Sequence, residues 1–142
     1  MLKNGFTLVE LLIVIIIIAI LSIVGIGGYY NFIEKGRENT AVNALRVLHT
    51  SIEMYSTDTK GIYPRANSLN ELKEAIKKYL PGGEMPQNPY NNMPYSDENN
   101  NYYRITYTYD PVENSYTLIV RNRYNYKRLL LLSNRIVIMG ER

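Results

Sequence analysis

The stretch KNGFTLVELLIVIIIIAIL, residues 3–21, decides the architecture of the N-terminal part of the chain. It opens an apolar segment, residues 6–28, that follows a short polar leader, residues 1–5. A helix needs about 20 predominantly apolar residues to cross the roughly 30 Å hydrocarbon layer of a bilayer, and this segment has that length. The sequence therefore predicts a transmembrane helix. Within it, polar side-chain groups occur at three positions: Thr7, Glu10 and Ser22.

Glu10 is the feature of this helix that membrane insertion by itself does not explain. Ionisable residues inside a membrane are costly, and they are usually paired and functional. A plain signal anchor would account for the apolar run and for Lys3 on the cytoplasmic side, but it gives the carboxylate no role. A cleaved secretory signal has a shorter apolar core followed by an A-x-A-like site, which is missing here. The sequence therefore predicts that something neutralises Glu10.

The helical pattern continues beyond the apolar segment. From Ile33 to Tyr55, apolar residues recur at intervals of three and four, which is the pattern of one face of an amphipathic helix. No linker separates the two parts, so we expect one helix from about Phe6 to Tyr55, roughly 75 Å long at 1.5 Å per residue. Each glycine inside a helix costs about 1 kcal/mol. Three glycines form the predicted weak point of this helix: Gly25, Gly27 and Gly28.

A short second helix and a long loop follow. Ser68 and Glu71 have the spacing of a capping box, and they stand before an apolar stripe that ends at Leu80. The next stretch, residues 81–101, contains four prolines and six asparagines. We expect it to be irregular, and loops of this length in a compact domain are often functional or packed on the surface.

The C-terminal part predicts an antiparallel sheet. Residues 102–109 and 115–121 alternate between two faces, and DPVEN between them has the composition of a turn. RLLLL and RIVIM, residues 128–132 and 135–139, suggest a second hairpin, which gives three or four strands. Helix first and strands last indicate an α+β fold with the sheet laid on the long helix. Residues 29–142 would then be a soluble globular head that includes the amphipathic half of this helix.

KNGFTLVE followed by an uninterrupted apolar run resembles the class III signal of type IV pilins and type II secretion pseudopilins. The resemblance implies that a prepilin peptidase cuts between Gly5 and Phe6 and that the new amino group of Phe6 is methylated. It implies that an assembly ATPase and a platform protein extract the helix from the bilayer into a helical homopolymer. Glu10, without a partner in the free subunit, would meet the N-terminal ammonium of a neighbour in the polymer. Because a buried charge needs its counter-charge, this pair would align the subunits.

Weaker similarities extend into the head. Gly27 stands where many pilins have a helix-bending proline, and Tyr29 stands at the aromatic position that follows. DTKGIYP and MPQNPYNNMPY are similar to the D-x-G-x-YP and P-x-D-P-W-x-N elements of major pseudopilins, with Asn88 and Tyr90 replacing Asp and Trp. After about Tyr102 the resemblance is limited to the strand pattern.

Catalysis, metal binding and nucleic-acid binding are the alternatives. His49 is the only histidine, no cysteine is present, and no acid partner stands out, so a packed or solvated helix residue is expected rather than a catalytic one. Calcium could be held by loop acids, chiefly Asp110 and Glu113, with Asp97 and Glu98 as weaker candidates; their spacing is poor, and Asp110 before a proline is an ordinary turn opener. No other cofactor is expected.

The basic segment RNRYNYKR could bind DNA, with arginine and lysine on phosphates and tyrosines stacking on bases. The simpler interpretation is a strand edge that charged residues protect from unwanted pairing. The residues in question are Arg121, Arg123, Tyr124, Tyr126, Lys127 and Arg128.

The function predicted from the sequence is that of a structural subunit of a type IV pilus-like filament. The alternatives are a major pseudopilin of a type II secretion system and a DNA-uptake pilin that binds DNA through its basic C-terminal region. The precursor is expected to span the cytoplasmic membrane once, with its N-terminus in the cytoplasm. The assembled filament would be extracellular or periplasmic.

Overall fold

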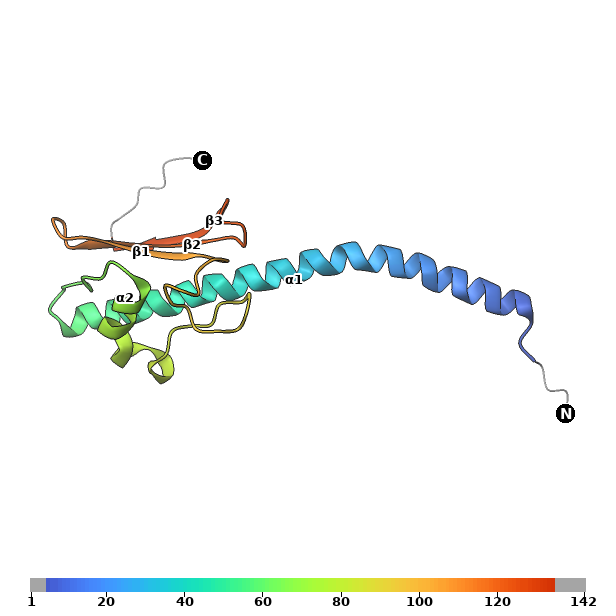
Figure 1. The fold of residues 1–142 in the computed structure, drawn as a ribbon, viewed down its shortest axis with the longest axis horizontal. Coiled ribbons are helices and arrows are strands. Elements are labelled where there is room, and N and C mark those ends of the chain that lie inside the picture. Colours follow the sequence, from blue (N-terminus) through green and yellow to red (C-terminus); the bar gives the residue numbers. More distant parts are fainter. Residues whose placement is uncertain (1–4, 135–142) are drawn as a thin grey trace. The chain divides into compact units, whose positions relative to one another are not determined.

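A computed structural model describes residues 5–134, with Val24 described by its backbone alone. The first element is a continuous helix of 51 residues, α1 (Leu8–Asp58) (Figure 1). It begins two residues later and ends three residues later than the sequence predicts. The chain leaves the helix through Lys60 and Gly61, which both take positive φ, and the Gly61 amide donates to the Ser56 carbonyl at 2.8 Å. This left-handed exit satisfies a carbonyl that the helix itself leaves open.

The chain forms two compact units, with the division after Gly36. In the first unit the described apolar side chains of α1 are exposed from Leu8 to Phe32, and Ile33 and Glu34 are half-buried. In the second unit the face of α1 predicted to be apolar is buried, including Ala41, Leu45, Leu48 and Ile52. The same helix is therefore uncovered in one unit and a core element in the other.

The second helix, α2 (Leu69–Ile76), confirms the predicted cap at its start. The Ser68 hydroxyl accepts a hydrogen bond from the Glu71 amide at 3.2 Å. The Glu71 carboxylate accepts from the amide of Asn67 at 2.8 Å, one residue before the partner that a standard capping box uses. Two short 3-10 turns follow, η1 (Lys77–Tyr79) and η2 (Pro81–Gly83).

The sheet has three antiparallel strands within residues 5–134, in the order β1 (Ile105–Asp110), β2 (Ser115–Arg121) and β3 (Arg128–Ser133). The predicted start of the first strand at Tyr102 is wrong by three residues. Tyr103 takes a left-handed conformation with φ of 51°, and the Asn100 side chain holds both backbone groups of Ile105 at 2.9 and 2.7 Å. This clamp turns the chain into β1. RIVIM lies outside the described residues.

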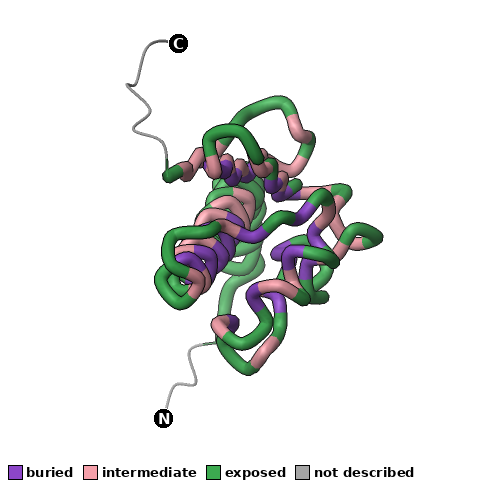
Figure 2. Tube along the Cα trace, turned by 90° about the vertical axis from the view of Figure 1, so that its left-hand side faces the viewer, coloured by how far each residue is buried: buried purple, intermediate pink, exposed green. Residues whose placement is uncertain are grey.

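One core lies between the sheet, the C-terminal half of α1 and the α2 region (Figure 2). The strands alternate as predicted, with Ile105 and Tyr107 of β1 and Tyr116, Leu118 and Val120 of β2 facing inward. Burial of these side chains is the main force that holds the sheet on the helix.

The long loop is packed rather than structureless. Asn88 is only 1% exposed, its side-chain amide donates to the Tyr102 carbonyl at 2.9 Å, and its side-chain oxygen accepts from the Tyr90 amide at 2.9 Å. A further anchor is Asp97, whose carboxylate accepts from the Leu69 amide at 2.8 Å. These polar anchors replace secondary structure, because they satisfy backbone groups that would otherwise be buried without partners.

Candidate functional site

Glu10 lies in the first turn of α1 and is bound to Thr7, the residue just before the helix. Its Oε2 accepts hydrogen bonds from the Thr7 amide and from the Thr7 hydroxyl, both at 2.8 Å. In return the Thr7 hydroxyl accepts from the Glu10 amide at 3.3 Å. This is a reciprocal capping box, and it satisfies two amides at the start of the helix.

Glu10 therefore has hydrogen-bond donors in the free subunit, whereas within the described residues no opposite charge pairs with it. The helix start supplies two donors within three residues, so the carboxylate is held locally before it meets any other chain. Thr7 is a residue whose role the sequence pattern did not reveal, although the spacing T-x-x-E ahead of an apolar run is the signal that would have found it. Two donors bind the carboxylate without neutralising its charge.

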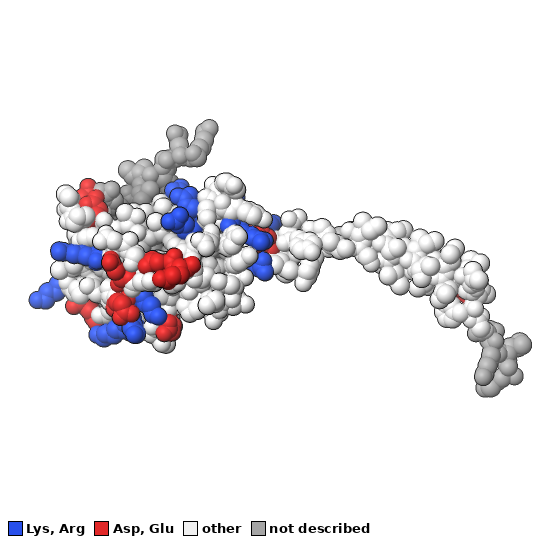
Figure 3. Space-filling view, in the orientation of Figure 1, with Lys and Arg blue, Asp and Glu red and all other residues white. Residues whose placement is uncertain are grey.

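The surroundings of this site are apolar and open. Phe6 is 82% exposed and Leu8 is 81% exposed, and the aliphatic side chains from Val9 to Ile26 for which the structure gives a value are likewise exposed. The N-terminal half of α1 is long and apolar enough to cross a bilayer, and no part of its most apolar stretch is buried within the described structure. Figure 3 shows charged side chains spread over the second unit, whereas the apolar helix is almost free of them on the face in view. Such a helix requires lipid or other apolar surfaces around it.

The three glycines of the predicted weak point have no packing role within the described chain. α1 passes through Gly25, Gly27 and Gly28 without interruption, and a methyl group added at any of them would meet nothing within 4 Å. None of the three has a positive φ. The helical conformation of these three residues thus does not require glycine. The predicted weak point of α1 is an expectation for the helix in the assembled filament.

The residues of the proposed DNA site lie at the end of β2, in the turn that follows and at the start of β3. They do not form one basic face, because Arg123 is turned toward aromatic rings: its guanidinium lies 5.4, 5.8 and 5.5 Å from the ring centroids of Tyr90, Tyr102 and Tyr124. Lys127 and Arg128 are exposed, and Arg121 is half-buried. The surface that DNA binding would need, with stacking rings and free basic groups side by side, is therefore only partly present in this segment.

The two aspartates considered for calcium, Asp110 and Asp97, bind backbone amides. Asp110 Oδ1 accepts from the amides of Val112 and Glu113 at 2.9 and 3.4 Å, which is the turn that its sequence predicts. Asp97 binds the start of α2. Within residues 5–134 no cluster of three histidine, cysteine or acidic side chains could hold a metal ion.

His49 belongs to a hydrogen-bonded group that ties α1 to β2. The Tyr116 hydroxyl lies 2.6 Å from His49 Nδ1 and donates to Glu53 Oε1 at 2.6 Å. The Tyr116 hydroxyl has a single hydrogen, which it donates to Glu53. In the hydrogen bond between Tyr116 and His49, His49 Nδ1 is therefore the donor and the Tyr116 oxygen is the acceptor. The Tyr63 hydroxyl donates to the other Glu53 oxygen at 3.3 Å. These bonds join the helix to the sheet. Because Tyr116 is only 1% exposed, a substrate cannot reach its hydroxyl.

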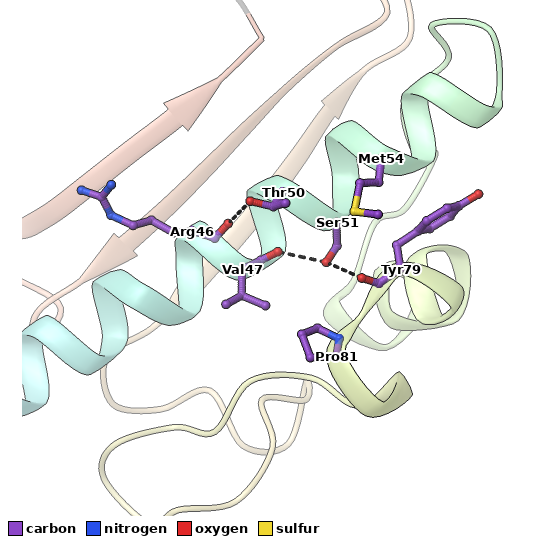
Figure 4. Close-up of a pocket in the computed structure, with 7 residues that line it drawn as sticks. All are labelled: Arg46, Val47, Thr50, Ser51, Met54, Tyr79 and Pro81. Atoms are coloured by element: carbon purple, nitrogen blue, oxygen red, sulfur yellow. Dashed lines mark hydrogen bonds between the residues drawn. The ribbon is translucent and has the colours of Figure 1, made fainter.

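A groove of about 330 Å³ lies on the other side of α1 in the second unit (Figure 4). Val47, Thr50 and Met54 of the helix form one wall, and Tyr79 and Pro81 form the other. Ser51 bridges the two walls, since its hydroxyl contacts the carbonyls of Val47 and Tyr79 at 2.9 and 3.2 Å. Arg46 is the only charged residue of the lining, so the groove presents no acid–base pair for catalysis.

Comparison with known proteins places the N-terminal segment in a family. The model of the prokaryotic N-terminal methylation motif matches residues 1–26, which cover the leader, Thr7, Glu10 and the apolar part of α1. No curated protein and no solved structure matches the chain. The motif is typical of structural proteins rather than enzymes, and with the long exposed apolar helix it describes a membrane-anchored precursor. Residues 1–26 thus carry the prokaryotic N-terminal methylation motif, which is the class III signal peptide of type IV pilin-like precursors.

Proposed function

We propose that this protein is a structural subunit of a type IV pilus-like helical filament. The observation that carries the proposal is the placement of Glu10: one carboxylate, held by Thr7, in the segment of α1 at residues 8–28, where the described side chains are exposed and, apart from Glu10 and Ser22, apolar. A helix with this surface is stable in a bilayer or among copies of itself, and one acid within it favours a partner that brings a positive charge. The mature N-terminus of a neighbouring subunit is such a partner.

The proposed route begins in the cytoplasmic membrane. Lys3 in the leader favours a cytoplasmic N-terminus, which places the bond between Gly5 and Phe6 on that side. Its partners there would be the bilayer, a prepilin peptidase that also methylates Phe6, and the assembly ATPase with its platform protein. The features that support the proposal concern assembly. Surface pili and secretion pseudopili share them, so the proposal covers both kinds of filament. The finished filament is extracellular or periplasmic.

Processing at Gly5 tests the proposal directly. In cells that carry the assembly machinery, we expect mass spectrometry of sheared filaments to find a chain that starts at N-methylated Phe6. A Gly5→Val variant should accumulate as uncleaved precursor, because a branched side chain crowds the backbone at the cut, whereas Gly36→Ala is the matched control and should be processed normally. Filaments built from chains that still begin at Met1 would contradict the proposal.

The glycine segment gives a second expected result. Because added methyl groups meet nothing within 4 Å, Gly27→Ala with Gly28→Ala should leave the subunit folded and make α1 more stable, by about 1 kcal/mol for each alanine. We expect a wild-type filament map to show irregular helical hydrogen bonding within residues 22–28, and the double variant to yield fewer sheared filaments. A straight, unbroken helix through these residues in the wild-type filament would refute this.

A further inference from the structure

The second unit has a surface rich in tyrosine and asparagine. It consists of the residues that are not buried in the loop at 88–104 and in the turn between β2 and β3, residues 122–127, and we call it the Tyr–Asn surface. Both segments lie at the same end of the sheet, opposite the turn that joins β1 and β2 (Figure 1). The Asn125 side-chain amide links them by donating to the Asn101 carbonyl at 3.0 Å.

Arg123 holds the aromatic part of this surface in place. Its guanidinium lies within 6 Å of the ring centroids of Tyr90, Tyr102 and Tyr124, a distance at which cation–π attraction acts. The Tyr90 and Tyr102 rings contact each other with centroids 4.1 Å apart. Among the described residues Arg123 Nε has no hydrogen-bond partner, so the rings are the main contacts of this cation. Arg123 therefore holds these tyrosines together.

Tyr124 and one further ring, that of Tyr126, are presented to solvent in a preformed geometry. Tyr124 is 60% exposed and Tyr126 is 89% exposed, with ring centroids 6.5 Å apart and ring planes 27° apart. Asn122 orders the turn, because its side-chain oxygen accepts from the amides of Tyr126 and Lys127 at 3.0 and 3.3 Å. Exposed, rigid tyrosines supply a large contact area at a small entropic cost.

A polar pocket of about 240 Å³ is lined by Asp97, Asn100, Asn101, Arg104 and Asn125, the last of which stands between Tyr124 and Tyr126 in the chain. One acid and one base cancel in formal charge, and the other three side chains are neutral amides. Amides both donate and accept hydrogen bonds, as a hydroxyl group requires of its partners. The pocket thus favours a neutral ligand with many hydroxyl groups.

We propose that the Tyr–Asn surface binds a neutral oligosaccharide. The apolar faces of sugar rings would lie on Tyr124 and Tyr126, and the hydroxyl groups would bind the side chains of Asn101 and Arg104, because the side-chain amides of Asn100 and Asn125 are held by Ile105 and by the Asn101 carbonyl. Nucleic acid suits the surface less well, because Arg123 is engaged by rings and Asp97 repels a phosphate chain. This inference does not depend on filament assembly, since every residue that carries it belongs to the second unit.

The test uses the full chain in detergent micelles, with an array of neutral oligosaccharides of hexoses and N-acetylhexosamines as probes and a single-stranded DNA oligonucleotide as the competitor class. We expect saturable binding to at least one neutral oligosaccharide. Its dissociation constant should change little between about 50 and about 300 mM salt, because a neutral ligand releases no counterions. Binding of the DNA alone, or no binding to any oligosaccharide, would overturn the proposal.

Variants of the exposed ring identify the site. Tyr126→Ala should weaken binding about fivefold, whereas Tyr126→Phe keeps the stacking face and should stay within about twofold of the wild type. The matched control is Val112→Ala, a 91% exposed residue in the opposite turn, which should bind as the wild type does. Tyr126 is exposed enough that its replacement leaves the core intact, and circular dichroism checks this. Equal binding by Tyr126→Ala and the wild type would place the sugar elsewhere and refute the assignment.

Discussion

Replacing Glu10 by valine is expected to abolish filament assembly while the precursor still enters the membrane and is still cleaved. Insertion should be intact or improved, because a charge is removed from an otherwise apolar helix. Cleavage should persist, because the bond that is cut lies at Gly5. Assembly should fail, since the ammonium of Phe6 on a neighbouring subunit would enter an apolar filament core without its counter-charge.

Thr7 makes this experiment sharper, because it separates two roles of the carboxylate. Thr7→Val removes the hydroxyl that binds Glu10 but leaves the charge and the backbone amide in place. If Glu10 acts through its charge, Thr7→Val should reduce filaments only partly, and Glu10→Gln should rescue little because an amide cannot neutralise an ammonium. If capping of α1 were the whole role, Thr7→Val would be as defective as Glu10→Val.

The measurement is to shear cells that express each variant as their only copy of the subunit and to compare sheared and membrane fractions by immunoblot. We expect Glu10→Val to lower the sheared fraction by about tenfold or more, because an unmatched buried charge disfavours every subunit contact. Mass spectrometry of the membrane fraction would show whether cleavage persists. Filaments at wild-type levels from Glu10→Val would show that assembly does not need the carboxylate charge.

The second large effect is a loss of stability of the second unit at high pH. Burial raises the pKa of Tyr95 and of Tyr107 well above the usual tyrosine value. The pKa of Tyr116 is raised in the same direction, first by burial and then by its hydrogen bond to Glu53. The hydroxyls of the first two donate to the carbonyls of Tyr103 and Pro64 at 2.8 and 2.7 Å, bonds that the ionised forms cannot make.

The direction of the pH effect follows from these raised values. Below about pH 10 the three tyrosines are neutral in the folded and the unfolded chain, so stability does not depend on them. Above it the unfolded chain loses these protons while the folded chain keeps them, and unfolding becomes easier. Each tyrosine then lowers the free energy of unfolding by about 1.4 kcal/mol per pH unit, or about 4 kcal/mol per pH unit for three.

Urea unfolding of the full chain in detergent micelles, followed by circular dichroism between about pH 8 and about pH 12, checks this expectation. The curve of free energy against pH should be nearly level to about pH 10 and then fall steeply. Tyr95→Phe should reduce the slope by one proton, whereas Val112→Ala, which removes no ionisable group from an exposed position, should leave it unchanged. A curve that stays level up to the highest pH would show that the core tyrosines ionise without unfolding.

Features that depend on near neighbours in the chain followed from the sequence. The apolar segment, the helical stripe from Ile33 to Tyr55, the Ser68 cap and the alternation of the strands involve residues two to four positions apart, and the structure shows all of them. The bond between Thr7 and Glu10 belongs to the same class, because it spans three residues.

Features that join distant segments were beyond the reach of any local pattern. Strand spacing did not reveal that Tyr103 bends the chain into β1, because this conformation depends on how Asn100 grips Ile105. From the sequence, Arg123 was expected to be a free cation in a basic segment. Only folding brings Tyr90 and Tyr102 next to its guanidinium. Asn88 read as part of an irregular loop, yet it is buried and anchors that loop.

By itself, the sequence determined that this chain carries a membrane helix with a methylation motif and one acid near its start, followed by an α+β head. These properties reside in composition and in contacts within one helical turn. The tertiary structure alone decided what each polar side chain of the head serves. Tyr116 meets Glu53 and His49 across 63 and 67 residues, and partners so far apart are brought together by burial of the apolar core rather than by local sequence.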